Sequence, residues 1–293
     1  MTLRSLPTSP AVAGAFLMVL AGGLFAVVNT LVQHAVMVQG VPPARLAFWQ
    51  YAVALAFAVP WLLAKGRAAL RTHMPGRHVL RVALAAGGVQ LWVMGLAHVP
   101  IWQAIALVML SPFFVTLGAA VLLREQATVQ RWLAVTVGFA GGMVILAPWS
   151  DAFRMQALLP VGAAALWAAS SLLTKRMTRT ESPETLTVYL LLLLTPVNAV
   201  LAVGDGIAMD LWTAGALLIA IGLLTALAQY ALVSSYGMAD ASFLQPFDHV
   251  KLPFNVALGI AAFGFVPPGT MWLGALMIVG GSLYLLWYER GSA

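Results

Sequence analysis

Leu24-Phe25-Ala-Val-Val-Asn29-Thr-Leu-Val-Gln33 lies in the first apolar run of the chain, and a similar stretch, Leu166-Trp167-Ala-Ala-Ser-Ser171-Leu-Leu-Thr-Lys175, follows about 140 residues later. An aromatic residue falls on an aromatic one (Phe25, Trp167), and a polar residue falls on a polar one (Asn29, Ser171). Three further pairs have nearly the same offset: Pro112-Phe113 with Pro253-Phe254, Gly141-Gly142 with Gly280-Gly281, and Gln90 with Gln229. The sequence therefore predicts two copies of one structural unit.

The composition is that of a membrane protein, because 62% of the 293 residues are hydrophobic and 8% are charged. A soluble domain averages about 25% charged residues, so these side chains could not cover a water-facing surface. A bilayer-spanning helix needs about 20 apolar residues. Ten runs approach or reach that length: residues 11–33, 44–64, 79–97, 101–122, 130–147, 157–174, 185–203, 211–235, 241–263 and 268–287. We predict an all-α integral membrane protein of ten transmembrane helices.

Each predicted copy contains five runs, with residues 1–150 as the first unit and 151–293 as the second. Because five is odd, the second unit must enter the membrane from the opposite side, although runs two and seven align poorly. Inverted repeats of this kind form transporters whose substrate site lies near the middle of the membrane. We expect a central cavity lined by runs one, three, four, six, eight and nine.

The basic residues predict the orientation. With the N-terminus inside, twelve Lys and Arg residues fall on the inner side, while Arg45 and Arg154 fall outside and Lys251 lies within a run. This asymmetry follows the positive-inside rule, so we expect both termini in the cytoplasm and a multi-pass protein of the bacterial inner membrane. The first run exceeds the length of about 7–15 residues of a signal-peptide apolar region, so we expect it to be retained as a helix.

An acid, an imidazole and an amine interrupt the ninth run, in Gln245-Pro-Phe-Asp248-His249-Val-Lys251-Leu-Pro253. Ionisable groups within a membrane cost at least about 2.5 kcal/mol each on insertion scales, so they are expected to pair or to face a watery cavity. Asp248 and Lys251 are three residues apart, within reach for an ion pair on a helix. Pro246 and Pro253 each remove a helix hydrogen bond, which predicts a loosened segment.

Three interpretations of this cluster stay open. Lys251 and Asp248 could bind the carboxylate and ammonium groups of a zwitterion, or they could neutralise each other as a structural pair. Asp248 and His249 could also relay protons. Gln245, His249 and Asn255 fall near the same helix face as Asp248 and complete the cluster of candidate substrate-binding residues.

Further candidates for substrate contact are aromatic and amide side chains at mid-membrane positions. Trp92 and Trp167 lie in the middle of their runs, where a cavity role and plain packing are equally compatible with the sequence. Gln90 and Gln229 require hydrogen-bond partners in a membrane, which either another helix or a ligand could supply. The remaining candidates are Asn29, Ser171 and Tyr230.

Four small-residue and proline patterns stand out along the chain: Ser111-Pro112-Phe-Phe-Val, Leu122-Leu-Arg-Glu125, Gly138-Phe-Ala-Gly-Gly142 and Trp272-Leu-Gly274-Ala-Leu-Met-Ile-Val-Gly280-Gly. With these patterns the chain resembles the drug/metabolite transporter superfamily, in particular its EamA-type ten-span members, and the resemblance extends over essentially the whole chain. It implies two five-helix repeats around a central cavity, alternating access, and export of amino acids, including aromatic ones.

We therefore predict a secondary transporter that exports a small polar metabolite, and an amino acid is the leading substrate. The alternative is a carrier for an organic anion or nucleotide-like metabolite, bound chiefly through Lys251; a channel or a polytopic enzyme is a weaker alternative. The chain has no cysteine, which excludes disulfides and thiolate metal sites, and it has none of the common hydrolase or phosphate-binding motifs. We expect no enzyme activity, no cofactor, no metal and no nucleic-acid partner, and we expect a monomer in contact with lipid.

Overall fold

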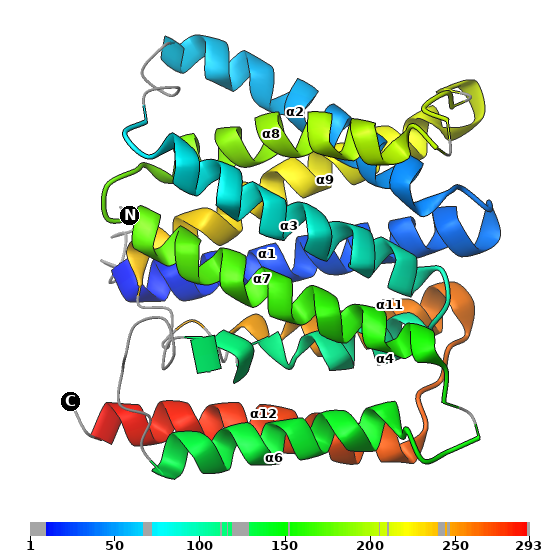
Figure 1. Ribbon diagram of the computed structural model, residues 1–293, viewed down its shortest axis with the longest axis vertical. Coiled ribbons are helices and arrows are strands. Elements are labelled where there is room, and N and C mark those ends of the chain that lie inside the picture. Colours follow the sequence, from blue (N-terminus) through cyan, green and yellow to red (C-terminus); the bar gives the residue numbers. More distant parts are fainter. Residues whose placement is uncertain are drawn as a thin grey trace, which may run out of the picture.

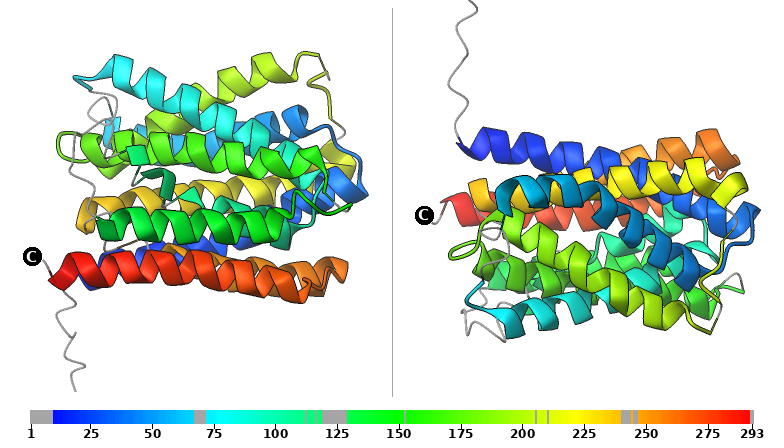
Figure 2. Two further views of the ribbon diagram at one scale, coloured as in Figure 1. Left: turned by 60° about the horizontal axis from the view of Figure 1, so that its bottom comes forward. Right: turned by 90° about the horizontal axis from the view of Figure 1, so that it is seen from above.

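The computed structural model of the chain is a bundle of long helices, and none of the described residues forms a strand (Figure 1). The structure describes residues 10–66, 72–111, 113–115, 117–118, 129–151, 153–204, 206–209, 211–239, 244 and 247–291. The helices run along a common direction, so that the connections gather at two ends of the bundle (Figure 2).

The helices of the first half begin with α1 (Pro10–Gln33), which continues into a π-helical turn, η1 (His34–Val38). They are followed by α2 (Pro43–Lys65), α3 (Pro75–Leu96), α4 (Ile101–Val108) and α6 (Val129–Leu146). The helices α2 and α3 each begin with a proline. Proline has no backbone N–H, and this costs nothing at the start of a helix, where an N–H has no partner within the helix.

The second half repeats this order. A short 3₁₀ turn, η3 (Met155–Ala157), leads into α7 (Leu158–Met177), and α8 (Pro183–Ala202), α9 (Leu211–Met238), α11 (Lys251–Phe263) and α12 (Gly269–Gly291) follow. At the start of α8, the Ser182 hydroxyl accepts a hydrogen bond from the Thr185 N–H, which caps the helix. Each of the ten predicted runs therefore contains at least one helix in the described part of the chain, and runs four and nine have further helical residues, 113–115 and 247–248, outside α4 and α11.

The ninth run differs from the uninterrupted helix that its length suggested. Its helix, α11, begins only at Lys251, and the residues just before it form a turn in which the Leu252 N–H donates to the His249 carbonyl at 3.0 Å. Pro253 explains the break, because a proline ring clashes with the carbonyl four residues earlier, here that of His249. In the first half, α4 likewise ends at Val108, four positions before Pro112 in the sequence.

Each described helix of the first half has a counterpart in the second: α1 and α7, α2 and α8, α3 and α9, α4 and α11, and α6 and α12. Exchanging every helix for its counterpart preserves the most extensive helix contacts, as two inverted repeats require. The helix α1 packs against α9, and their counterparts α7 and α3 pack against each other. The same exchange relates the contact of α1 with α11 to that of α7 with α4. Three pairs map onto themselves, namely α2 with α8, α4 with α11, and α6 with α12. The division of the chain at residue 150 stays a prediction.

Large apolar side chains cover the outside of the bundle, as a protein surrounded by lipid requires. Phe16, Leu63, Val200, Leu276 and Trp287 are each 68–73% exposed, whereas monomeric soluble proteins rarely expose such extended apolar surface. Among the described residues, five helical segments are long and apolar enough to cross a membrane: Val12–Val38, Pro75–Leu96, Met155–Met177, Pro183–Ala202 and Gly215–Met238. Further apolar helices are shorter. The protein is an all-α integral membrane protein.

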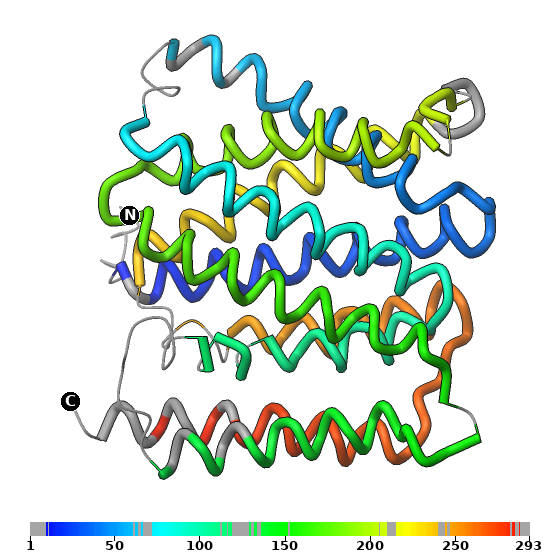
Figure 3. The backbone as a smooth tube through the Cα atoms, in the orientation of Figure 1, coloured from blue at the N-terminus to red at the C-terminus, as the bar shows by residue number. Residues whose placement is uncertain are grey.

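The helices α6 and α12 form a close pair at one edge of the bundle (Figure 3). Their backbones approach at Gly141 and Gly274, where a Cβ built on either glycine would lie 2.6 Å from the carbonyl oxygen of the other. Such contacts between small residues let transmembrane helices approach closely.

Substituting Gly141 with Leu should therefore separate α6 from α12. We expect Gly141→Leu to lower the thermal unfolding midpoint of the detergent-purified protein, because overpacking costs about 1–3 kcal/mol. Gly280→Leu is the matched control, since nothing lies within 4 Å of a Cβ at Gly280. Equal thermal unfolding midpoints for the two variants would contradict the close contact between α6 and α12.

Candidate functional site

A cavity of about 200 Å³ lies in the interior of the bundle between the two halves. Residues from α1, α3, α4, α7, α9 and the start of α11 line it, which agrees with the runs predicted to do so. The helices α2 and α8 also contribute, through Gln50 and Tyr51 and through Leu190 and Leu194. The described residues of α6 and α12 do not line this cavity.

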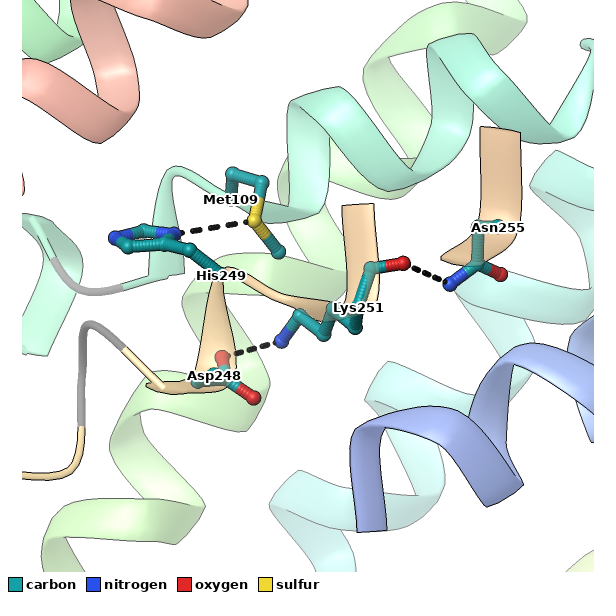
Figure 4. A network of polar contacts seen from close by, with 5 residues as sticks. All are labelled: Met109, Asp248, His249, Lys251 and Asn255. Carbon is teal, nitrogen blue, oxygen red and sulfur yellow. Dashed lines mark hydrogen bonds and ion pairs between the residues drawn. The ribbon is translucent and has the colours of Figure 1, made fainter. Parts of the chain in front are cut away.

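The charged pair of the ninth run lines the cavity. The Lys251 ammonium lies 2.5 Å from Asp248 Oδ2, and the two side chains are 17% and 20% exposed (Figure 4). This geometry confirms that the two groups are within ion-pair reach. Because the pair sits at the break before α11, its orientation is set by how α11 begins.

A chain of hydrogen bonds holds that beginning in place. The Asn255 amide donates to the Lys251 carbonyl at 2.7 Å, and the Asn29 amide donates to Asn255 Oδ1 at 3.1 Å. The Trp92 indole N–H donates in turn to Asn29 Oδ1 at 3.2 Å. Three helices from both halves, α11, α1 and α3, are thereby joined beside the cavity.

His249 turns away from the cavity. Its side chain is 5% exposed, and Nδ1 lies 3.2 Å from the sulfur of Met109, in the turn after α4 (Figure 4). The turn at the end of α4 therefore meets the turn before α11. In the described part of the chain no hydrogen bond joins His249 to Asp248, and a proton relay between them stays a prediction.

Two tryptophans form an aromatic wall. The rings of Trp92 and Trp167 lie 5.7 Å apart between centroids at an angle of 51°, and both line the cavity together with Phe25. Gly88 makes room for this arrangement, since a Cβ there would lie 2.4 Å from the indole nitrogen of Trp167.

The structure places the other predicted residues at different distances from the cavity. Ser171, Gln229 and Asn29 line the cavity, whereas Asn255 lies behind it in the hydrogen-bond chain. Gln90 donates to Asn198 Oδ1 at 2.8 Å, an interhelical bond away from the lining, and Tyr230 is 43% exposed on the outside of α9. Gln245 lies outside the described residues.

Several polar lining residues were not predicted. Arg81 was one of the twelve basic residues assigned to the inner side, although it lies two residues inside the predicted third run; its side chain is 1% exposed inside the bundle. Ser170 and Thr174 could have been found, since they follow Trp167 at helical spacings of three and seven residues. Gln50 and Tyr51 gave no such signal, because the second run aligned poorly with the seventh.

Buried polar groups at the meeting point of two inverted repeats are the arrangement of a secondary transporter. Comparison with known proteins agrees. Residues 12–147 match the EamA-like transporter family. The chain is 52% identical to a riboflavin transporter of Rhizobium johnstonii, over 97% of this chain and 94% of that protein. The chain belongs to the EamA-like transporters of the drug/metabolite transporter superfamily, and it is a transporter rather than an enzyme.

Two further relatives and one solved structure extend the comparison. A riboflavin transporter of Vibrio cholerae is 49% identical, with 94% of this chain and 93% of that protein covered. An S-adenosylmethionine uptake transporter of Rickettsia bellii is 25% identical over 84% of each chain. A crystal structure matches with a TM-score of 0.66 at 19% identity, covering 96% of this chain and 97% of the other, and it supports the fold alone.

The Asp248–Lys251 pair should behave as a coupled unit. We expect Asp248→Ala and Lys251→Ala each to lower the thermal midpoint, because each leaves an unpaired charge in a mostly buried place. The double variant should lose less than the sum of the two, with a coupling on the order of 1 kcal/mol or more. The measurement is thermal unfolding of the four proteins in one detergent. Additive losses would show that the two charges are independent.

Proposed function

We propose that this transporter carries riboflavin. The observation that carries the proposal is the identity of 52% to a riboflavin transporter over nearly the full length of both chains. The Vibrio cholerae relative, and a third at 47% identity from Brucella anthropi, have the same name. Amino-acid export, the leading prediction from the sequence, has no support from the relatives named above.

The cavity chemistry suits a flavin. Riboflavin combines a flat, three-ring aromatic system with a polar pyrimidine edge and a chain of hydroxyl groups, and it has no net charge. Trp92, Trp167 and Phe25 offer ring faces to such a system, since aromatic pairs add about 0.5–1.5 kcal/mol beyond the area that they bury. The amide and hydroxyl groups of Gln229, Ser171 and Gln50 line the same cavity and can serve hydroxyls or ring carbonyls.

The Asp248–Lys251 pair would have a definite part in binding riboflavin. An ammonium can donate to a ring carbonyl, and a carboxylate can accept from the neighbouring ring N–H, and hydrogen bonds with one charged partner are roughly twice as strong as neutral ones. The same pair is the feature that favours a second candidate substrate, an amino acid, whose two charges it could bind. The two candidates are separable by competition.

The decisive experiment is counterflow in proteoliposomes. Vesicles loaded with unlabelled riboflavin should accumulate labelled riboflavin, and external lumiflavin should compete, whereas tryptophan and S-adenosylmethionine should not. Accumulation of labelled tryptophan, without exchange of riboflavin, would replace the flavin with an amino acid as the substrate.

Within this assay, Trp167→Leu should weaken the binding of riboflavin. Loss of one aromatic contact worth about 0.5–1.5 kcal/mol corresponds to an increase of roughly two- to tenfold in the half-saturating concentration. Trp272→Leu is the control, because Trp272 is 47% exposed on α12 and does not line the cavity. An equal effect of both substitutions would show that the Trp167 ring is not part of the riboflavin-binding site.

We also propose that both termini face the cytoplasm, and that the basic end of the bundle, defined as the end where α1 begins and α12 ends, is the inner one. The chain has no cysteine, so single cysteines report position without background. Gln39→Cys, after η1, should react with a membrane-impermeant maleimide in intact cells. Thr180→Cys, between α7 and α8, should react only after permeabilisation, and the reverse pattern would invert the topology.

A further inference from the structure

One buried charge of the cavity has no opposite charge beside it among the residues that the structure describes. Three charged side chains line the cavity, Arg81, Asp248 and Lys251, as far as the described residues show. Asp248 and Lys251 pair with each other. Arg81 is 1% exposed, and an arginine keeps its charge at any physiological pH.

The hydrogen bonds that the Arg81 guanidinium makes with described residues are all to neutral groups. Nη1 donates to the Thr174 hydroxyl at 3.3 Å, and Nη2 donates to the Leu186 carbonyl at 2.5 Å. Nε is buried and has no hydrogen-bond partner among the described residues. A guanidinium has five N–H donors in a planar fork that fits carboxylate and phosphate oxygens. The group therefore retains donors and a full positive charge.

The nearby ionisable groups are engaged elsewhere. Glu181 is buried, and its carboxylate accepts from the Thr72 hydroxyl at 2.7 Å and from the His73 backbone N–H at 3.3 Å. His78, one turn before Arg81 on α3, stacks on Tyr189 with 4.2 Å between ring centroids. Within the part of the chain that the structure describes, no carboxylate lies within ion-pair distance of Arg81.

We propose that Arg81 is an anion subsite of the cavity, bounded by Ser170 and Thr174, and that it binds the phosphate of a phosphorylated flavin. This inference rests on the proposed function, because the ring system would occupy the aromatic wall. Riboflavin itself is neutral and leaves Arg81 uncompensated, whereas a phosphate monoester carries about −1.5 to −2 charges at pH 7. Flavin mononucleotide, the phosphate ester of riboflavin, would place its ring system against the aromatic wall and its phosphate at Arg81.

The test compares binding of riboflavin, flavin mononucleotide and inorganic phosphate to the full-length protein in detergent, by quenching of tryptophan fluorescence and by thermal stabilisation at constant ionic strength. In the wild-type protein, flavin mononucleotide should bind at least about tenfold more tightly than riboflavin, the lower range for a hydrogen bond to a charged group. Inorganic phosphate alone should displace flavin mononucleotide and leave riboflavin bound.

Arg81→Gln should abolish this preference, and Arg81→Lys should retain part of it. The matched control is Arg176→Gln, because Arg176 lies exposed near the end of α7, outside the cavity lining, and its substitution should leave the preference intact. The phosphate displacement needs no variant, so the test survives a failure of Arg81→Gln to fold.

The outcomes separate this inference from the proposed function. Two results would overturn the anion subsite and leave the riboflavin proposal standing. One is binding of riboflavin with no preference for flavin mononucleotide; the other is a loss of that preference in Arg176→Gln as large as in Arg81→Gln. Binding of phosphate or flavin mononucleotide that depends on Arg81, without any binding or counterflow of riboflavin, supports the subsite and overturns the riboflavin proposal.

Discussion

The absence of water from the membrane core shapes this protein, because a buried polar group without a partner is costly there and a partner must come from the protein or a ligand. The hydrogen-bond chain from Trp92 through Asn29 and Asn255 to the Lys251 carbonyl supplies such partners within the protein. Each of its members needs the next one, so α3, α1 and the start of α11 are fixed relative to one another. The cavity and its charged pair depend on that arrangement.

The helix breaks follow from the same constraint. The backbone is not helical just after α4 and just before α11, and these two turns contact each other through Met109 and His249. Irregular backbone is tolerated at membrane depth where protein or a cavity surrounds it rather than lipid. The packing of one turn on the other satisfies this condition, and it places non-helical backbone close to the cavity, as in other transporters with discontinuous helices.

Patterns within the sequence were enough to predict the ten helical runs, the inverted repeat and the reach of Asp248 to Lys251, because these depend on length, parity and local spacing. The break before α11 was half anticipated, since the two prolines predicted a loosened segment but not the residue at which the helix begins. The partner of Asn29 could not be predicted, because Asn255 lies 226 positions away in the chain.

Arg81 shows a different limit of sequence reasoning. A cation near the start of an apolar run has the same pattern whether it lies in an inner connection or points into the bundle. Its place is decided by the packing of α3 against α7 and α8, which supplies the Thr174 hydroxyl and the Leu186 carbonyl. Span boundaries drawn from hydropathy miss such a residue, because one helical turn separates the two alternatives.

The two halves are alike in backbone but not in the side chains at their centre. Both Asn29 and its repeat counterpart, Ser171, line the cavity, but the longer Asn29 side chain also joins α1 to α3 and α11. A bundle with identical halves would be equally stable whether open to one side of the membrane or to the other. Because Asn29 and Ser171 differ, symmetry no longer holds the two openings at equal free energy, and we expect a substitution at Asn29 to shift the resting conformation of the carrier.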